Sequence, residues 1–224
     1  SFGGEAIPAL TPRALGFTTL GALAQIGATA LMLLTMKQRS FAVTTAWIKT
    51  EPVLVALIAA LVLGDPLTWT ALLAIAIATA GVLLMSVKPG SGLAMWREAG
   101  PALTGLLAGA LFGASAIGFR GGITSLETGG FLIRATTTLA LSLVLQTAIL
   151  LIWLALFDRT ALRASFRVWR SSLGAGFLGA FASQFWFIGF SLTSAANIRT
   201  LALVEVIFAQ AVSRFVFRQA VSKR

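Results

Sequence analysis

Long apolar runs separated by short polar segments make up most of the chain. A helix rises about 1.5 Å per residue, so about 20 apolar residues suffice to cross the hydrocarbon layer of a membrane. Backbone N–H and C=O groups find no water in that layer, which favours helices. The pattern therefore predicts an all-α fold, a polytopic membrane helix bundle with seven spans at residues 14–36, 41–63, 67–87, 102–119, 131–156, 172–192 and 195–216.

The segments between the spans contain residues that end helices. Gly64-Asp65-Pro66 predicts a tight turn, because proline is well placed to begin the next helix. A stretch rich in proline, glycine and serine begins a flexible linker over residues 89–101. This linker divides the chain into residues 1–88 and residues 102–224.

Glycine recurs at helical spacing along the fourth span and just beyond it, at Gly105, Gly109, Gly113, Gly118 and Gly122. Small residues at this spacing predict close packing of helices in a membrane. Gly121-Gly122 and Gly129-Gly130 are expected to bracket a short loop after this span.

Two carboxylates lie inside apolar runs, at matching points of two similar segments. A shift of the sequence by 154 positions places Glu51 on Glu205, and residues 39–42 beside residues 193–196. A carboxylate at that depth costs about 2.5 to 3.5 kcal/mol on insertion scales, so it is expected to face a partner or a cavity. Two such acids related by a repeat predict a transport site at a repeat interface.

The composition agrees with a multi-span membrane protein. Hydrophobic residues make up 58% of the chain, the mean hydropathy is +0.92, and charged residues make up 11%, against roughly 25% in soluble proteins. Cysteine, histidine and tyrosine are absent. Disulfides, thiolate or imidazole metal sites and catalytic triads that need His or Cys are thereby excluded. We expect no enzyme activity and no cofactor.

The formal net charge of +10 fits the positive-inside bias of membrane loops better than nucleic-acid binding, because no basic stretch is interleaved with aromatic residues. With alternating spans, one side holds the basic loops at residues 37–39, 88–97, 159–170 and 218–224, and the other holds Arg13 and Arg120. The basic side is expected to be cytoplasmic, in the cell (inner) membrane. The basic loop precedes the Glu51 helix but follows the Glu205 helix, as inverted repeats require.

Several motifs occur in an order that one transporter family shows. They are Arg39-Ser40 and Glu51-Pro52-Val53, then Leu63-Gly64-Asp65 and Gly81-Val82-Leu83-Leu84, and in the second half Phe119-Arg120, Arg134 and Thr193-Ser194-Ala195-Ala196. In this order they resemble the EamA domain of the drug/metabolite transporter (DMT) superfamily, over nearly the whole chain.

The resemblance implies ten helices in two five-helix repeats of inverted topology, of which this chain holds helices three to nine. Residues 1–88 would then form the last three helices of the first EamA repeat. Residues 102–224 would form four helices of the second, whose last helix is missing. The resemblance also implies efflux of a small metabolite or drug-like solute in exchange for protons.

Glu51 is the leading candidate for binding substrate or protons. Pro52 removes a helix hydrogen bond beside it, which predicts a kink with a freed carbonyl at membrane depth. The alternative is a structural kink with the acid in a fixed ion pair. Glu205 keeps the depth in a small apolar surround, which suits a proton carrier or a structural role equally. Trp47, one turn before Glu51, lies on the same face of the helix and is expected to line the same cavity.

Three further side chains complete the candidate substrate site. Lys49 lies about 200° from Glu51 on one helix, so it either extends to the cytoplasmic surface or meets Glu205 or an anionic substrate. Arg134 lies about one turn into its helix and either anchors to headgroups or binds a carboxylate. Gln184 either makes an interhelical hydrogen bond or contacts a ligand.

Other polar and aromatic side chains are expected to be structural. Arg199 lies about 240° round the helix from Glu205, so a direct pair of these two is not expected. Gln25 is expected to bond to a neighbouring helix. Trp153 and Trp169 are expected in the aromatic belt at the membrane surface.

The sequence thus predicts a secondary transporter of a small polar or amphipathic metabolite that works by rocking two inverted halves. Its expected partners are the solute, protons as the coupling ion, the lipid bilayer and a second copy of the chain in a homodimer, and no nucleic acid. A membrane scaffold whose buried charges hold helices together is the alternative. An intramembrane enzyme is disfavoured because the interior offers no histidine, cysteine or aspartate pair.

Overall fold

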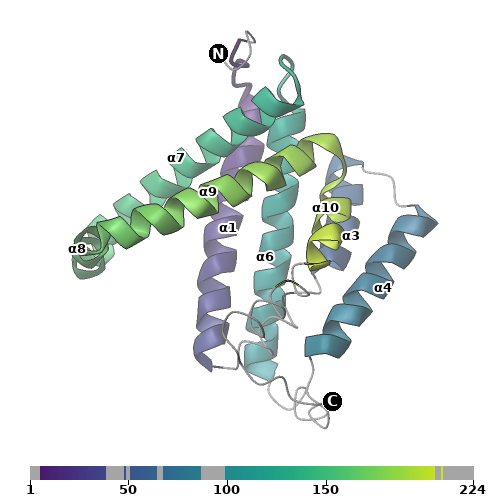
Figure 1. The fold of residues 1–224 in the computed structure, drawn as a ribbon, viewed down its shortest axis with the longest axis horizontal. Coiled ribbons are helices and arrows are strands. Elements are labelled where there is room, and N and C mark those ends of the chain that lie inside the picture. Colours follow the sequence, from purple (N-terminus) through teal and green to yellow (C-terminus); the bar gives the residue numbers. More distant parts are fainter. Residues whose placement is uncertain are drawn as a thin grey trace. The chain divides into compact units, whose positions relative to one another are not determined.

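The computed structural model describes residues 6–38, 48, 51–64, 68–86, 99–204 and 208. This described part is helical with short connections and contains no strand, which confirms the predicted all-α class. Its elements are α1 (Pro12–Gln38), α3 (Glu51–Leu63), α4 (Trp69–Ser86), α6 (Ala99–Thr124), α7 (Phe131–Phe157), α8 (Arg159–Arg167), α9 (Trp169–Leu192), α10 (Ala195–Leu201) and the 3₁₀ turn η1 (Ala202–Val204) (Figure 1).

Four of the described helices are long and apolar enough to cross a membrane, at Pro12–Lys37, Leu103–Thr124, Phe131–Phe157 and Trp169–Leu192. Glu51–Leu63 and Ala195–Val204 are shorter apolar helices. Large apolar side chains stand exposed along α9, among them Phe177 at 70% and Phe181 at 56%. Such surfaces are typical of helices that contact hydrocarbon, so the chain has the features of a membrane-embedded protein. The count of seven spans stays a prediction.

The chain divides into two compact units. The first unit comprises Ser1–Ile26 and Ala114–Ser194, and the second comprises Gly27–Gly113 and Ala195–Arg224. Helices α1 and α6 each contribute one end to the first unit and the other end to the second. Each unit therefore draws on both of the sequence segments that were predicted as repeats.

In the first unit, α7 and α9 lie side by side and α8 joins them (Figure 1). The end of α6 contacts α9 through Phe119 and Phe187, whose ring centroids are 4.8 Å apart. The same part of α6 bonds to α1, because the Ser115 hydroxyl donates to Gln25 Oε1 at 2.9 Å. This bond is the interhelical contact predicted for Gln25.

Glycines allow α1 and α6 to touch at the backbone within the first unit. A Cβ added at Gly118 would lie 2.7 Å from Gly21 Cα and 2.8 Å from the Phe17 carbonyl oxygen. A Cβ at Gly121 would lie 2.6 Å from the Phe17 ring. Only a residue without a side chain fits at such positions, so the glycine stripe packs as the sequence predicts.

The predicted start of the loop after the fourth span is wrong, because α6 does not stop at residue 119 but continues past Gly121-Gly122 to Thr124. Both glycines face α1, where Gly122 approaches the Thr18 side chain. They serve helix packing rather than chain reversal. The turn comes later, at Gly129, whose φ of +88° is the left-handed conformation that glycine adopts readily.

The segment predicted as a basic loop over residues 159–170 is mostly helical. The Asp158 carboxylate accepts a hydrogen bond from the Ala161 N–H at 2.9 Å and so caps the start of α8. Such a cap satisfies a backbone donor that a helix start otherwise leaves free. Helix α9 then begins at Trp169, three residues before the predicted start.

In the second unit, α10 packs against both α3 and α4, and α3 packs against α4. A Cβ added at Gly113 would lie 3.0 Å from Val55 Cγ2, so α6 approaches α3 closely there. Thr35 of α1 donates to Thr104 of α6 at 3.1 Å. Gly64 follows α3 with a φ of +70°, in agreement with the predicted turn, whose residues 65 and 66 lie outside the described ranges.

The contact at Gly118 predicts a sharp difference between two glycine substitutions. Gly118→Ala adds a Cβ against backbone atoms that have no flexible side chain to move, and overpacking of this kind costs about 1–3 kcal/mol. Gly176→Ala is the matched control on α9, where a Cβ meets nothing within 4 Å. It should gain about 0.5–1 kcal/mol from helix propensity. Thermal unfolding of the detergent-solubilised chain by circular dichroism measures both, and equal midpoints would contradict the close contact.

Candidate functional site

An ion pair joins α3 to α10 in the second unit. Arg199 Nε lies 2.9 Å from Glu51 Oε1, and the two side chains are 16% and 9% exposed, respectively. The packing of α10 on α3 brings together two residues that are far apart in the sequence. The carboxylate predicted to lie inside an apolar run therefore faces a cationic partner.

The buried face of α3 explains why Glu51 points inward. Glu51, Val55 and Ala59 are all buried and follow each other at intervals of four residues, so they lie on one side of the helix. Pro52, next to the acid, is fully buried as well, whereas Leu61 is 87% exposed. The carboxylate thus shares the protein-facing side of α3. The kink predicted at Pro52 stays a prediction.

Burial makes this pair sensitive to the loss of either member. Removing two charges from water is costly, and their mutual attraction repays the cost only when both are present in close geometry. Arginine suits such a position because its guanidinium stays charged and offers several donors. Loss of one partner leaves the other charge buried without compensation.

Arg134 and Gln184 belong to the first unit, on α7 and α9. Gln184 Nε2 donates to Thr136 Oγ1 at 3.0 Å, which is the interhelical bond given above as the alternative to ligand contact. Arg134 Nη1 makes a long contact of 3.5 Å to the Leu126 carbonyl, and no described residue accepts from its buried Nε. Arg134 and Thr136 point about 200° apart on α7, so the structure does not bring Arg134 and Gln184 together.

Arg120 has a structural role that the sequence did not indicate. Its Nη1 donates to the carbonyl oxygens of Phe190, at 2.9 Å, and of Thr193. The last carbonyls of a helix lack partners within the helix, and a cation there also offsets the negative end of the helix dipole. Arg120 of α6 therefore holds the carboxyl end of α9 within the first unit.

Three of the predicted site residues, Glu205, Lys49 and Trp47, lie outside the described residues. Their depth and their relation to Glu51 stay predictions. The described part of the predicted last span consists of α10, which ends at Leu201, and the 3₁₀ turn η1 that follows it. Position 208 is also helical.

Arg199 is the site residue that sequence reasoning missed. Its angular position on the helix excludes a direct pair with Glu205 but does not bear on a pair with Glu51 of another helix. One signal could have found it. Each buried acid needs a cation. Apart from Arg214, which lies two residues from the end of the last predicted span, only Lys49, Arg134 and Arg199 lie within the predicted spans. Lys49 cannot reach Glu51 along one helix, which leaves the two arginines.

A scan against protein-family models finds no match for this chain, and a search of the curated proteins finds none. The resemblance to the EamA domain accordingly stays an expectation drawn from the order of the motifs.

The ion pair can be tested with a double-mutant cycle. Glu51→Gln and Arg199→Gln should each lower the free energy of unfolding by about 3–5 kcal/mol, because each leaves one buried charge alone. The variant with both substitutions should be more stable than the sum of the two losses predicts. Thermal unfolding midpoints in detergent measure the cycle, and Arg13→Gln, at an exposed position of the first unit, is the control for loss of a charge. Strictly additive losses would show that the two side chains do not interact.

Proposed function

We propose that this chain acts as a membrane transporter for a small charged or zwitterionic solute, with the Glu51–Arg199 pair at its binding site. The observation that carries the proposal is that pair: a carboxylate and a guanidinium, 2.9 Å apart and largely buried, on two apolar helices. Ionisable groups buried in membrane helices are by default indicators of a substrate or ion pathway.

The pair offers both charges that a zwitterionic solute would need. A carboxylate on the solute can replace Glu51 at Arg199, and an ammonium group can replace Arg199 at Glu51. Neither buried charge is then left alone while the pair is open, so the solute stabilises an opened state that is costly without it. Opening of the pair by the solute would then be coupled to the rocking of the two halves that alternating access requires.

The finer architecture is part of the same proposal. It consists of seven spans in two inverted EamA-type repeats, basic loops on the cytoplasmic side of the cell membrane, and export in exchange for protons. Glu205 would supply the second acid. The four apolar helices and the buried charges support this arrangement, and the order of the EamA-like motifs supports the family.

A membrane scaffold is the second candidate, and the same ion pair favours it. A fixed pair between α3 and α10 would hold these helices together, as the Gln184–Thr136 bond holds α9 and α7. The two functions differ in what the charges do. In a scaffold they affect assembly alone, whereas in a transporter they also bind solute.

Proteoliposomes with the full chain separate the two candidates. The probe is a panel of radiolabelled amino acids and short carboxylic acids, with uptake measured under an imposed proton gradient. The parent chain should accumulate at least one member of the panel. Glu51→Gln and Arg199→Gln should each lose at least about tenfold in rate, if the pair contributes 1.4 kcal/mol or more to solute binding.

Two controls keep this result interpretable. Arg13→Gln should transport as the parent does, because Arg13 lies outside the second unit. Gel filtration of each variant in detergent checks that it still folds and assembles. Full uptake by Glu51→Gln and Arg199→Gln would remove the pair from the transport site. Absence of uptake and of thermal stabilisation by every panel member, in the parent chain, would overturn the transporter proposal in favour of the scaffold.

A further inference from the structure

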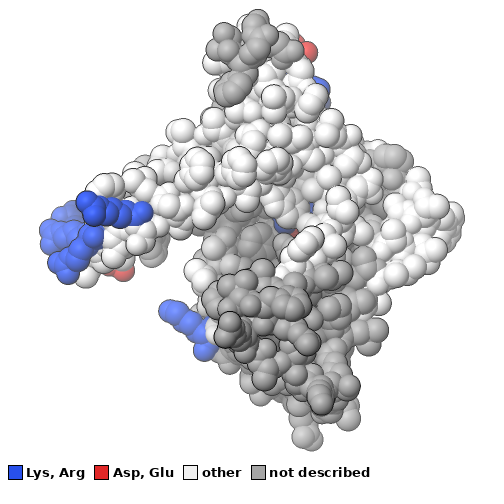
Figure 2. Space-filling view, in the orientation of Figure 1, with Lys and Arg blue, Asp and Glu red and all other residues white. Residues whose placement is uncertain are grey.

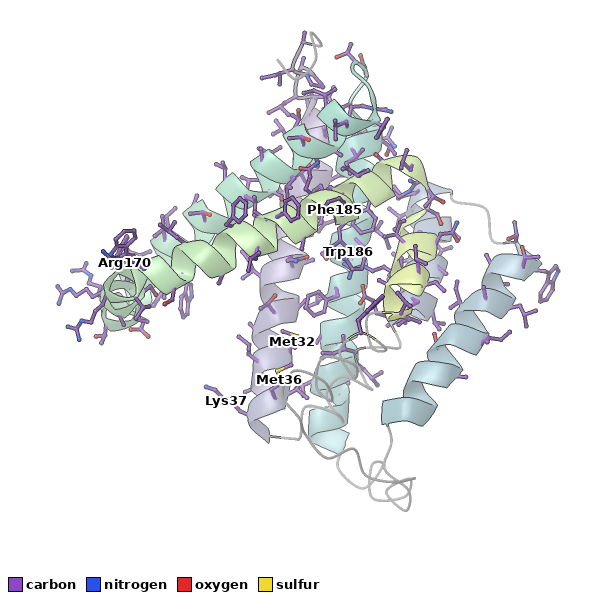
Figure 3. All side chains as sticks on the ribbon, viewed as in Figure 1. Met32, Met36, Lys37, Arg170, Phe185 and Trp186 are labelled. Atoms are coloured by element: carbon purple, nitrogen blue, oxygen red, sulfur yellow. The ribbon has the colours of Figure 1, made fainter. Side chains whose placement is uncertain are left out.

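Exposed arginines gather at the end of the α7–α8–α9 hairpin in the first unit. Arg159, Arg163 and Arg167 of α8 and Arg170 at the start of α9 form this group, called here the α8 basic surface. Figure 2 shows the basic side chains together at that end, and Figure 3 labels Arg170 among them. Since the three arginines of α8 are spaced by four residues, they form a stripe only about 80° wide.

The stripe points away from the protein. The half-buried side chains of α8 are Ala161 and Leu162, and every other residue of the helix is exposed. The direction midway between these two lies about 150° round the helix from the centre of the arginine stripe. Helix α8 thus packs against the hairpin with its small apolar side and presents its guanidinium groups outward.

The surface has an excess of positive charge, because few acids lie near it in the sequence. Asp158 is the one acidic residue between Glu127 and Glu205, and its Oδ1 accepts from the Ala161 N–H as the cap of α8. Arg159 Nε donates a hydrogen bond to the Ala155 carbonyl at 2.9 Å and so caps the carboxyl end of α7. Among the described residues, no carboxylate forms an ion pair with Arg163 or Arg167.

Aromatic side chains mark the depth at which this surface lies. Trp153 and Phe157, at the end of α7, have ring centroids 5.9 Å apart and are 53% and 72% exposed. Trp169, at the start of α9, is 52% exposed, and the Arg170 guanidinium lies 5.5 Å from its ring centroid. Exposed tryptophans at the ends of apolar helices sit at the level of lipid headgroups. Helix α8 connects these two ends, so its arginines belong to the same layer.

We propose that the α8 basic surface binds the phosphate groups of anionic phospholipids and holds α8 in the headgroup layer. All the basic residues of this surface are arginines, whose planar guanidinium binds phosphate oxygens in pairs. Four cations beside a membrane span also match the pattern of segments that recognise anionic lipids. The exposed Phe166 lies beside the stripe and can enter the acyl boundary, as in helices that lie in a membrane interface. The proposal does not depend on transport.

The absence of cysteine makes a direct test simple. Ala164→Cys places a single thiol on the exposed part of α8, where a fluorescent bimane can be attached. The labelled full chain is reconstituted in phosphatidylcholine vesicles that contain equal small fractions of nitroxide-labelled phosphatidylglycerol or nitroxide-labelled phosphatidylcholine. The measured quantity is the ratio of quenching by the anionic lipid to quenching by the zwitterionic lipid.

In the parent chain, quenching by the anionic lipid should be several times stronger than quenching by the zwitterionic lipid. Each basic residue near an anionic surface strengthens binding to that surface by about fivefold. The combined substitution Arg163→Gln and Arg167→Gln should lower the quenching ratio towards one. Arg163→Lys with Arg167→Lys keeps the charges and should retain most of the selectivity. Arg13→Gln, outside the surface, should leave the ratio unchanged. Circular dichroism confirms that each variant remains helical.

Three results would overturn the proposal. The first is a ratio near one in the parent chain, and the second is an unchanged ratio after Arg163→Gln and Arg167→Gln. The third distinguishes lipid from soluble phosphate. Replacement of chloride by inorganic phosphate at equal ionic strength should leave the ratio as it is, and a fall would assign the surface to a free phosphate ligand.

Discussion

A polar group in hydrocarbon finds no water, so it must find its partner within the protein. In the described helices, polar side chains find partners in three places: in the same helix, in a neighbouring helix, or in a helix far away in the sequence. Short hydroxyls bond within their own helix, as Thr18 does to the Ala14 carbonyl at 2.7 Å. Longer amides bond to a second helix, as Gln184 does to Thr136. The charged Glu51 requires a full counter-charge, which Arg199 provides from a distant part of the chain.

The same environment explains the close contacts at glycine. Lipid is as apolar as leucine, so burial of apolar side chains gives little drive for two helices to associate, and van der Waals contact between backbones matters more. In the first unit Gly118 lies against Gly21, and in the second Gly109 lies against the backbone of Ile48. Small residues at these places let polar pairs such as Ser115–Gln25 come within bonding distance.

The existence of the long helices was predictable, because a run of about 20 apolar residues leaves few other structures for the chain. The position at which α6 ends was not predictable from the sequence. Two adjacent glycines are typical of a turn, and only the position of Phe17 on another helix shows that they serve packing. Helix α8 did carry a local signal, since Asp158 is a suitable cap and arginines recur every four residues after it. A count of charges on each side of the membrane predicts only a basic loop here, whereas the spacing of the arginines indicates a helix.

Of the two residues in the ion pair, only Glu51 could be predicted from the sequence. Depth in an apolar run identified Glu51 from the sequence, because a buried acid is costly wherever it occurs. Its partner could not be identified in the same way. Which helix packs against α3 is decided by tertiary contacts, whereas the repeat symmetry of the sequence indicates only Glu205. The packing of α10 against α3 is what places Arg199 beside Glu51.

The energetics of this pair bear on the choice between scaffold and transporter. Replacement of a buried ion pair by apolar side chains of similar volume is often neutral or stabilising, so an ion pair is an inefficient way to join two helices. In hydrocarbon an uncharged hydrogen bond, such as the one between Gln184 and Thr136, joins two helices without the insertion cost of two charges. A scaffold accounts for the pairing of the two charges but not for their presence. A site that exchanges its internal partners for those of a solute accounts for both, and this difference favours the transporter.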